Sequence, residues 1–188
     1  MSVQTRSQLQ ASALTITNET AAGANTAARV GGLFDDLADT ATLDSERGYA
    51  SVATGTDRTF LTTNNVAVQL QIATTGNILS SSNFTRVATV AGPTITYTGT
   101  LSVAIRVSAN LTFSGANGDS YTWYIHKNGV QIPSSETSIT LSHSNGHQVV
   151  LETFLVANTN DVFSIYVYSF NGNNTITITA ISFNAHTL

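Results

Sequence analysis

The stretch YIHKNGVQIP, residues 124–133, decides the fold. Its centre, Lys127-Asn128-Gly129, lies between two runs of strand-forming residues. An Asn-Gly pair at such a position favours a two-residue turn, because both residues accept the positive φ angles that a tight hairpin requires. The stretch therefore predicts a β-hairpin, and the sequence around it decides whether that hairpin stands alone.

Further short strand-forming runs extend on both sides of the hairpin, from about residue 64 to the end of the chain. Gly, Asn and Ser separate them, and these are turn residues. In TITITAISF (175–183) we expect Ile176, Ile178, Ala180 and Phe183 to share one face. In VFSIYVYSF (162–170) both faces are apolar, so we expect the second sheet to pack on one face and a neighbouring subunit on the other. Many short strands with regular turns predict a β-sandwich or barrel. The strands are expected near residues 66–73, 84–90, 95–97, 101–113, 120–127, 131–132, 138–143, 147–156, 162–170 and 175–184.

The first part of the chain has a different period. Apolar residues with helical spacing follow a possible helix N-cap at Asn25 or Thr26, and they include Val30, Leu33, Phe34 and Leu37. Residues 1–45 contain too few apolar groups for a core of their own. We therefore predict a short helix in an anchoring or trimerisation segment that packs on sister chains or a docking partner; a helix packed on its own domain is the alternative. Residues 46–63 are expected to form a linker or neck, and residues 64–188 a head domain.

Composition excludes several classes of partner. The chain lacks cysteine, so thiolate metal sites and thiol catalysis are excluded. Its net charge of −4 argues against nucleic acid, because phosphate binding needs clustered Lys and Arg. No run approaches the ~18 apolar residues of a membrane span, so we expect no membrane insertion. The N-terminus lacks the layout of a secretory signal, which favours assembly in the cytoplasm.

The candidate chemistry is sparse. His143 and His147 flank an Asn145-Gly146 turn, so their spacing does not create the helical zinc site that it otherwise suggests. The acidic cluster of Asp35, Asp36 and Asp39 is interpreted as a solvated helix face. No nucleophile elbow or phosphate-binding glycine loop is present. The sequence therefore predicts no enzyme, no cofactor and no metal site.

Two features suggest a ligand surface. Trp123 lies beside Tyr121 and Tyr124 and is expected in the core or at a subunit interface, with a sugar-stacking platform as the alternative. The Asn- and Ser-rich loops 115–120, 142–146 and 171–174 could hydrogen-bond glycans, although ordinary turn chemistry explains the same residues. The candidate ligand-loop residues are Asn117, Asn145, Asn171 and Asn173.

The order of strands and turns resembles the jelly-roll head shared by the complement-component globular domains and the tumor necrosis factor family. The matching elements are the Asn128-Gly129 turn, the Asn160-Asp161 turn, Tyr166–Phe170 and Ile178–Leu188. The resemblance covers residues 64–188, with departures where the family often has Gly-Asp or a Gly-aromatic signal. It implies an antiparallel jelly-roll β-sandwich and a homotrimer. Its implied subunit contacts are Tyr124, Tyr166, Tyr168 and Phe170.

The N-terminal run ALTITNETAAGANTAARVGGLFDDLADT, residues 13–40, is similar to a segment recurrent in structural proteins of tailed bacteriophages, especially fibers and related appendages. The resemblance implies attachment to a virion or organisation of a trimer. The residues that would carry this role are Arg29, Val30, Leu33, Phe34 and Leu37.

Together these patterns favour a non-enzymatic virion appendage of a bacteriophage. Residues 1–45 would bind other virion proteins, and a trimeric head on the particle surface would bind a host cell-surface glycan or protein. The alternatives are a head fiber or capsid decoration protein without a receptor role, and a cellular lectin-like jelly-roll module.

Overall fold

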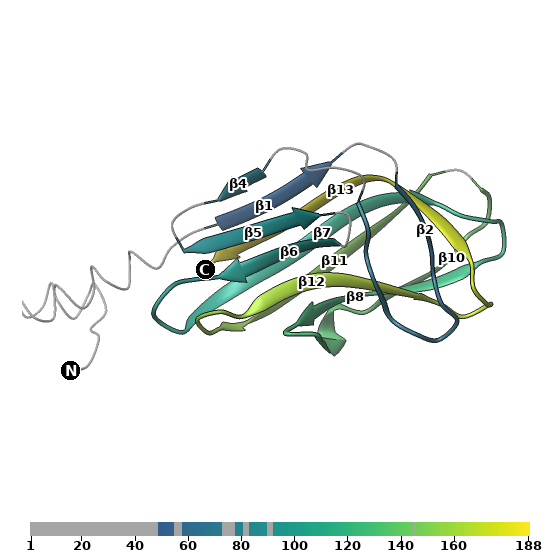
Figure 1. Ribbon diagram of the computed structural model, residues 1–188. Coiled ribbons are helices and arrows are strands. Elements are labelled where there is room, and N and C mark those ends of the chain that lie inside the picture. The colour runs from purple at the N-terminus through teal and green to yellow at the C-terminus, as the bar shows by residue number, and fades with distance from the viewer. Residues whose placement is uncertain (1–48, 55–57, 73–77, 81–82, 90–91, 145) are drawn as a thin grey trace, which may run out of the picture. The chain divides into compact units, whose positions relative to one another are not determined.

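The computed structural model describes residues 49–188 apart from 55–57, 73–77, 81–82, 90–91 and 145. Two antiparallel sheets pack as a β-sandwich (Figure 1). The first sheet has the order β11-β7-β13-β1-β4, with β2 also paired to β13. The second has the order β10-β8-β12-β6-β5, with β3 paired to β12 and β9 paired to β8.

The strands of the first sheet are β1 (Tyr49–Thr54), β2 (Arg58–Leu61), β4 (Ile78–Ser80), β7 (Val103–Ser114), β11 (His147–Ala157) and β13 (Thr175–Thr187). Those of the second are β3 (Val68–Gln69), β5 (Phe84–Thr89), β6 (Gly92–Tyr97), β8 (Ser120–Lys127), β9 (Val130–Gln131), β10 (Thr137–Thr140) and β12 (Val162–Ser169). A short 3-10 helix, η1 (Pro133–Ser135), connects β9 to β10.

The path of the chain gives the sandwich its jelly-roll topology. Successive strands change sheet at every step from β2 to β5, at β6–β7, at β7–β8 and at every step from β10 to β13, so many neighbours in a sheet come from distant parts of the sequence. This confirms the expected antiparallel jelly-roll sandwich. The opening hairpin is also present, with β8 paired to β9 across the Asn128-Gly129 turn.

The sandwich begins earlier in the chain than expected. Residues 49–54 and 58–61, assigned above to a linker, form β1 and β2. β1 lies between β13 and β4, with register from Tyr49↔His186 to Thr54↔Ile181. The Thr, Ser and Gly content of this region resembles a linker, but strand preference depends mainly on the neighbours that a strand meets. The N-terminal helix, Arg29, Val30, Leu33, Phe34 and Leu37 lie outside the described residues.

The core is built by alternation along the long strands. In β13, Ile176 and Ile178 are buried, and a register shift then occurs between Ile178 and Ala180. After this bulge Ile181 and Phe183 face the core, so the expected placement of Ala180 in the core was wrong. An extra residue at a bulge changes which side chains face inward, and the period-2 pattern of the sequence does not show it.

The inner face of the second sheet is fully packed. Trp123 is completely buried, and its ring centroid lies 4.9 Å from that of Phe113 on the opposite sheet. This confirms Trp123 as a core residue and removes the sugar-platform alternative for it. Phe163, Ile165 and Val167 of β12 are also buried on this inner face.

Candidate functional site

The sandwich has two ends with different polar chemistry. One, here called the network end, carries the Asn128-Gly129 turn and the β11–β12 turn, residues 158–161. The other, here called the pocket end, carries the loops 115–119, 141–146 and 171–174. At the network end Asn128 and Gly129 have φ angles of 53° and 78°. Both values lie in the left-handed region, as a type I′ hairpin turn requires.

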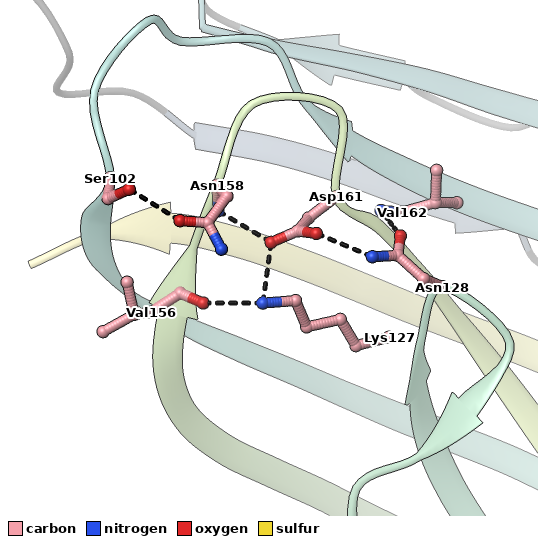
Figure 2. A network of polar contacts seen from close by, with 7 residues as sticks. All are labelled: Ser102, Lys127, Asn128, Val156, Asn158, Asp161 and Val162. Carbon is pink, nitrogen blue, oxygen red and sulfur yellow. Dashed lines mark hydrogen bonds and ion pairs between the residues drawn. The ribbon is translucent and has the colours of Figure 1, made fainter.

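Side-chain contacts join the two turns of the network end (Figure 2). Lys127 Nζ lies 2.7 Å from Asp161 Oδ2 and donates to the Val156 carbonyl at 2.9 Å. Asn128 Nδ2 donates to Asp161 Oδ1 at 2.7 Å, while its Oδ1 accepts from the Val162 amide at 2.8 Å. The Asn158 amide also donates to Asp161 Oδ2, at 2.7 Å. The Asn-Gly turn is thus bound to the Asn-Asp turn by one shared carboxylate.

The electrostatics of Asp161 favour its charged form. Burial acts to raise the pKa of this carboxyl, but the bonds from Lys127, the Asn158 amide and Asn128 outweigh burial and lower it. A carboxylate held by an ion pair and several donors is stable and has little capacity left for a ligand. The network end therefore has a structural role.

The pocket end brings together the loops that the sequence singled out. Asn171 Nδ2 donates to the Gly118 carbonyl at 3.0 Å, so loops 171–174 and 115–119 lie side by side. Asn173 Oδ1 accepts from the Asn64 amide at 2.9 Å. Asn117 is exposed, and Asn145 lies outside the described residues. Two of the four predicted ligand-loop residues are therefore committed to contacts within the chain.

A shallow pocket lies where these loops join their strands. Its volume is about 260 Å³, and it is lined by Ser120, Tyr121, Ser138, Ile139, Thr140 and Phe170. Ser120, Thr140 and Phe170 are the residues at which the three loops join or approach their strands. Sequence reasoning identified the loops but not the pocket, which exists only because β10, β8 and β12 are adjacent in the second sheet.

The predicted subunit contacts lie together on the outer face of the second sheet. The hydroxyl groups of Tyr124 and Tyr168 are 2.9 Å apart, with their rings stacked at 5.6 Å. The Phe170 ring meets that of Tyr168 edge-on at 5.0 Å. The sequence analysis missed His126 in this row, which stacks on Tyr166 at 3.9 Å. Tyr124 is only 3% exposed within one chain, whereas Phe170 is 47% exposed, so the row is covered at Tyr124 and open at Phe170.

Burial also acts on the titrating groups of this aromatic row. It lowers the pKa of His126, although a contact between Nδ1 and the Gly129 carbonyl opposes the effect. Burial and the bond to Tyr168 raise the pKa of Tyr124. Both shifts favour the neutral forms of His126 and Tyr124, which suits a packing role.

A second apolar surface lies on β11, at the edge of the first sheet. Val150, Phe154 and Val156 point outward and are 60%, 62% and 55% exposed. Glu152, between them on the same face, pairs with Arg106 of β7. The run VVLETFLV is apolar on both faces, and that pattern is the signal from which this stripe could have been predicted. We call Val150, Phe154 and Val156 the β11 stripe.

Two other kinds of site are absent from the described residues. That part of the chain contains no group of three or more His, Asp or Glu residues placed to hold a metal ion. Nor does it include a helix long and apolar enough to cross a membrane.

Comparisons with known proteins add little to this geometry. No protein-family model matches the chain, and no curated protein matches it. Among solved structures, the chain is similar to Eiger TNF from S. frugiperda, with a TM-score of 0.46 and 9% sequence identity. The match covers 76% of this chain and 92% of that chain.

Proposed function

We propose that this chain is a non-enzymatic virion appendage of a bacteriophage, in which the jelly-roll sandwich is a head that binds the host surface. Residues 1–45 attach it to other virion proteins. The resemblance of the N-terminal run, residues 13–40, to a segment of phage appendage proteins supports the attachment role. The jelly-roll head supports a binding role rather than a catalytic one, because its polar end loops surround an open pocket without a charged cluster.

The single observation that carries the proposal is that the chain enters the sandwich at the end opposite the pocket. Tyr49 pairs with His186, and Thr187 pairs with Ile105 near the start of β7, so the chain enters the sandwich at the network end. In Figure 1 the C-terminus marks this end. The pocket end lies at the other end of the same strands, beyond Ser114 and Phe170. The chain before Tyr49 therefore joins the sandwich at the end opposite the pocket.

We further propose that the head is a homotrimer, which would bind a repetitive cell surface with threefold avidity. Two surfaces offer apolar contact area. One is the predicted set Tyr124, Tyr166, Tyr168 and Phe170, and the other is the β11 stripe. The β11 stripe leaves more apolar surface uncovered in the single chain, and such patches mark interaction sites.

Attachment is tested by deleting residues 1–45 from the gene in a phage that carries it. We expect the truncated protein to fold, because the described sandwich begins at Tyr49. We also expect it to be absent from purified particles by immunoblot. Truncated protein that remains on particles would refute the attachment role. A second arm adds the purified full-length chain to host cells and measures cell binding by flow cytometry; no binding would instead indicate a decoration protein.

Oligomeric state is tested by light scattering on the full chain, with Phe154→Glu and Phe170→Glu as matched variants. A buried, unpaired carboxylate costs several kcal/mol, so the variant at the true interface dissociates. Dissociation by Phe154→Glu alone assigns contact to the β11 stripe, and dissociation by Phe170→Glu alone assigns it to the predicted set. A monomeric unmodified chain would refute the trimer.

A further inference from the structure

The pocket at the pocket end is built mainly from uncharged hydroxyl groups. Ser120, Ser138 and Thr140 line it, together with the Phe170 ring. Its volume of about 260 Å³ lies just below the ~300–1,000 Å³ of drug-sized ligand sites. A ligand of that size is one small ring with its substituents.

The hydroxyls are arranged in two rungs across neighbouring strands. Ser120 Oγ and Thr140 Oγ1 are 2.8 Å apart, and Thr122 Oγ1 and Ser138 Oγ are 2.7 Å apart. Each hydroxyl can donate once and accept twice, so a mutual bond leaves every pair with one unused donor and several unused acceptors. Ser138 and Thr140 are exposed, which keeps this capacity open to a ligand.

Each hydroxyl pair adjoins an aromatic residue, Tyr168 in β12 and Phe170 directly after it. Thr122 pairs with Tyr168 in the register of β8 and β12, and the Phe170 amide donates to the Ser120 carbonyl at 3.0 Å. The edge-on contact with Tyr168 fixes the Phe170 ring, and 47% of Phe170 stays exposed. An aromatic face carries partial negative charge, which attracts polarised C–H groups.

Fixed hydroxyls with both donor and acceptor capacity, placed beside an exposed ring, match one ligand chemistry. A pyranose has hydroxyls of mixed donor and acceptor character along its edge and C–H groups on its face. None of the six lining residues carries a charge, so nothing here neutralises a carboxylate or phosphate. From this geometry we propose that the pocket binds a neutral hexose or N-acetylhexosamine unit. The ring lies on Phe170, and its hydroxyls bond to the Ser120–Thr140 pair and to Ser138, whose partner Thr122 is fully buried. This inference rests on the proposed role of the head in host binding.

Saturation-transfer difference NMR on the full-length chain tests the assignment. The probes are D-glucose, D-galactose, D-mannose and N-acetyl-D-glucosamine, with N-acetylneuraminic acid as the anionic comparison. We expect transfer to at least one neutral sugar, strongest for the protons on one ring face, and none to N-acetylneuraminic acid. Phe170→Ala should weaken binding about tenfold, because it removes the whole stacking contact. Thr140→Val should also weaken binding, since it keeps the side-chain shape and removes one hydroxyl.

Phe154→Ala is the matched control, because it removes an exposed phenyl ring from the other sheet. We expect it to leave sugar binding unchanged, and thermal melts confirm that each variant is folded. Absence of transfer from all four neutral sugars overturns the assignment. Equal loss in Phe154→Ala and Phe170→Ala, or binding of N-acetylneuraminic acid at least as strong, also overturns it. Host-cell binding by flow cytometry separates the two proposals: a chain that binds cells but no sugar retains the head's role and loses this inference.

Discussion

The two ends of the sandwich use similar polar residues in opposite ways. At the network end, the Asp161 carboxylate takes bonds from Lys127, Asn128 and the Asn158 amide. At the pocket end, the hydroxyls of Ser120 and Thr140 bond to each other, and this one bond leaves part of their hydrogen-bonding capacity unused. Polar groups with all partners inside the chain stabilise the fold, whereas groups with unused donors can bind something else. This difference, more than residue type, distinguishes an end whose polar groups are satisfied from an end with unused hydrogen-bonding capacity.

The largest expected effect comes from replacing one aspartate with alanine at each end and comparing the two losses in unfolding free energy. Asp161→Ala removes a buried carboxylate and leaves Lys127 without its charge partner, so we expect a loss of about 3 kcal/mol in unfolding free energy. Asp119→Ala, at the pocket end, removes one acceptor from the Tyr121 hydroxyl and should cost about 1 kcal/mol. Urea denaturation measures both. Equal losses would show that the network end is not the more strongly bound one.

A pair of asparagine substitutions gives the next largest difference. Asn128→Ala removes the bonds to Asp161 and Val162 and puts alanine at a φ of 53°, so we expect a loss of about 2 kcal/mol. Asn171→Ala removes one exposed bond to the Gly118 carbonyl, and its loss should be about 0.5 kcal/mol. Thermal or urea unfolding of the two variants side by side checks this order, and a larger loss for Asn171→Ala would reverse the comparison.

Acid should weaken the network end selectively. The folded-state pKa of Asp161 lies below its ordinary value of 3.8, so the folded chain takes up a proton less readily there than the unfolded chain. Its contribution is therefore fully present above the unfolded pKa and is lost as pH falls through the folded pKa. Asp161→Asn cannot titrate, so its unfolding free energy should fall less steeply over this range. Urea titrations at about pH 5 and about pH 2.5 test the slope, and parallel curves would contradict the assignment.

The smallest expected effect belongs to the pocket hydroxyls. Thr140→Val removes an exposed hydroxyl whose described hydrogen bond is the one to Ser120. The free energy of unfolding should therefore change by less than about 0.5 kcal/mol. Differential scanning calorimetry on the variant and the parent chain measures this change. A loss above about 1 kcal/mol would assign the hydroxyl rung to fold stability instead of ligand binding.

Local patterns predicted the parts of the fold that depend on neighbouring residues. The Asn128-Gly129 turn requires two positive φ angles, and few residue pairs supply them, so the hairpin was readable from sequence. β8 occupies the expected residues 120–127 and ends directly before this turn. β1 was missed because its stability comes from pairing with β13, more than a hundred residues away. Its own composition carries no comparable signal.

The candidate site was predictable only in part. Asn117, Asn171 and the neighbouring glycines marked the end loops as turns that could bind a ligand. The pocket itself depends on Thr140 of β10 and Ser120 of β8 lying beside Phe170, which follows β12, and single-strand patterns do not encode this arrangement. The charge network was also missed, because Lys127 and Asp161 are brought together by two turns that lie far apart in the sequence.

The position of β1 has a mechanical consequence. A head held through the chain before Tyr49 and pulled at the pocket end carries its load along the strand axes. β1 then slides against β13, and the register pairs from Tyr49↔His186 to Thr54↔Ile181 are loaded together instead of opening one after another. Strands sheared in this way resist force better than strands peeled from one end. The position of β1 between β13 and β4 would therefore let the sandwich resist unravelling from its N-terminal strand.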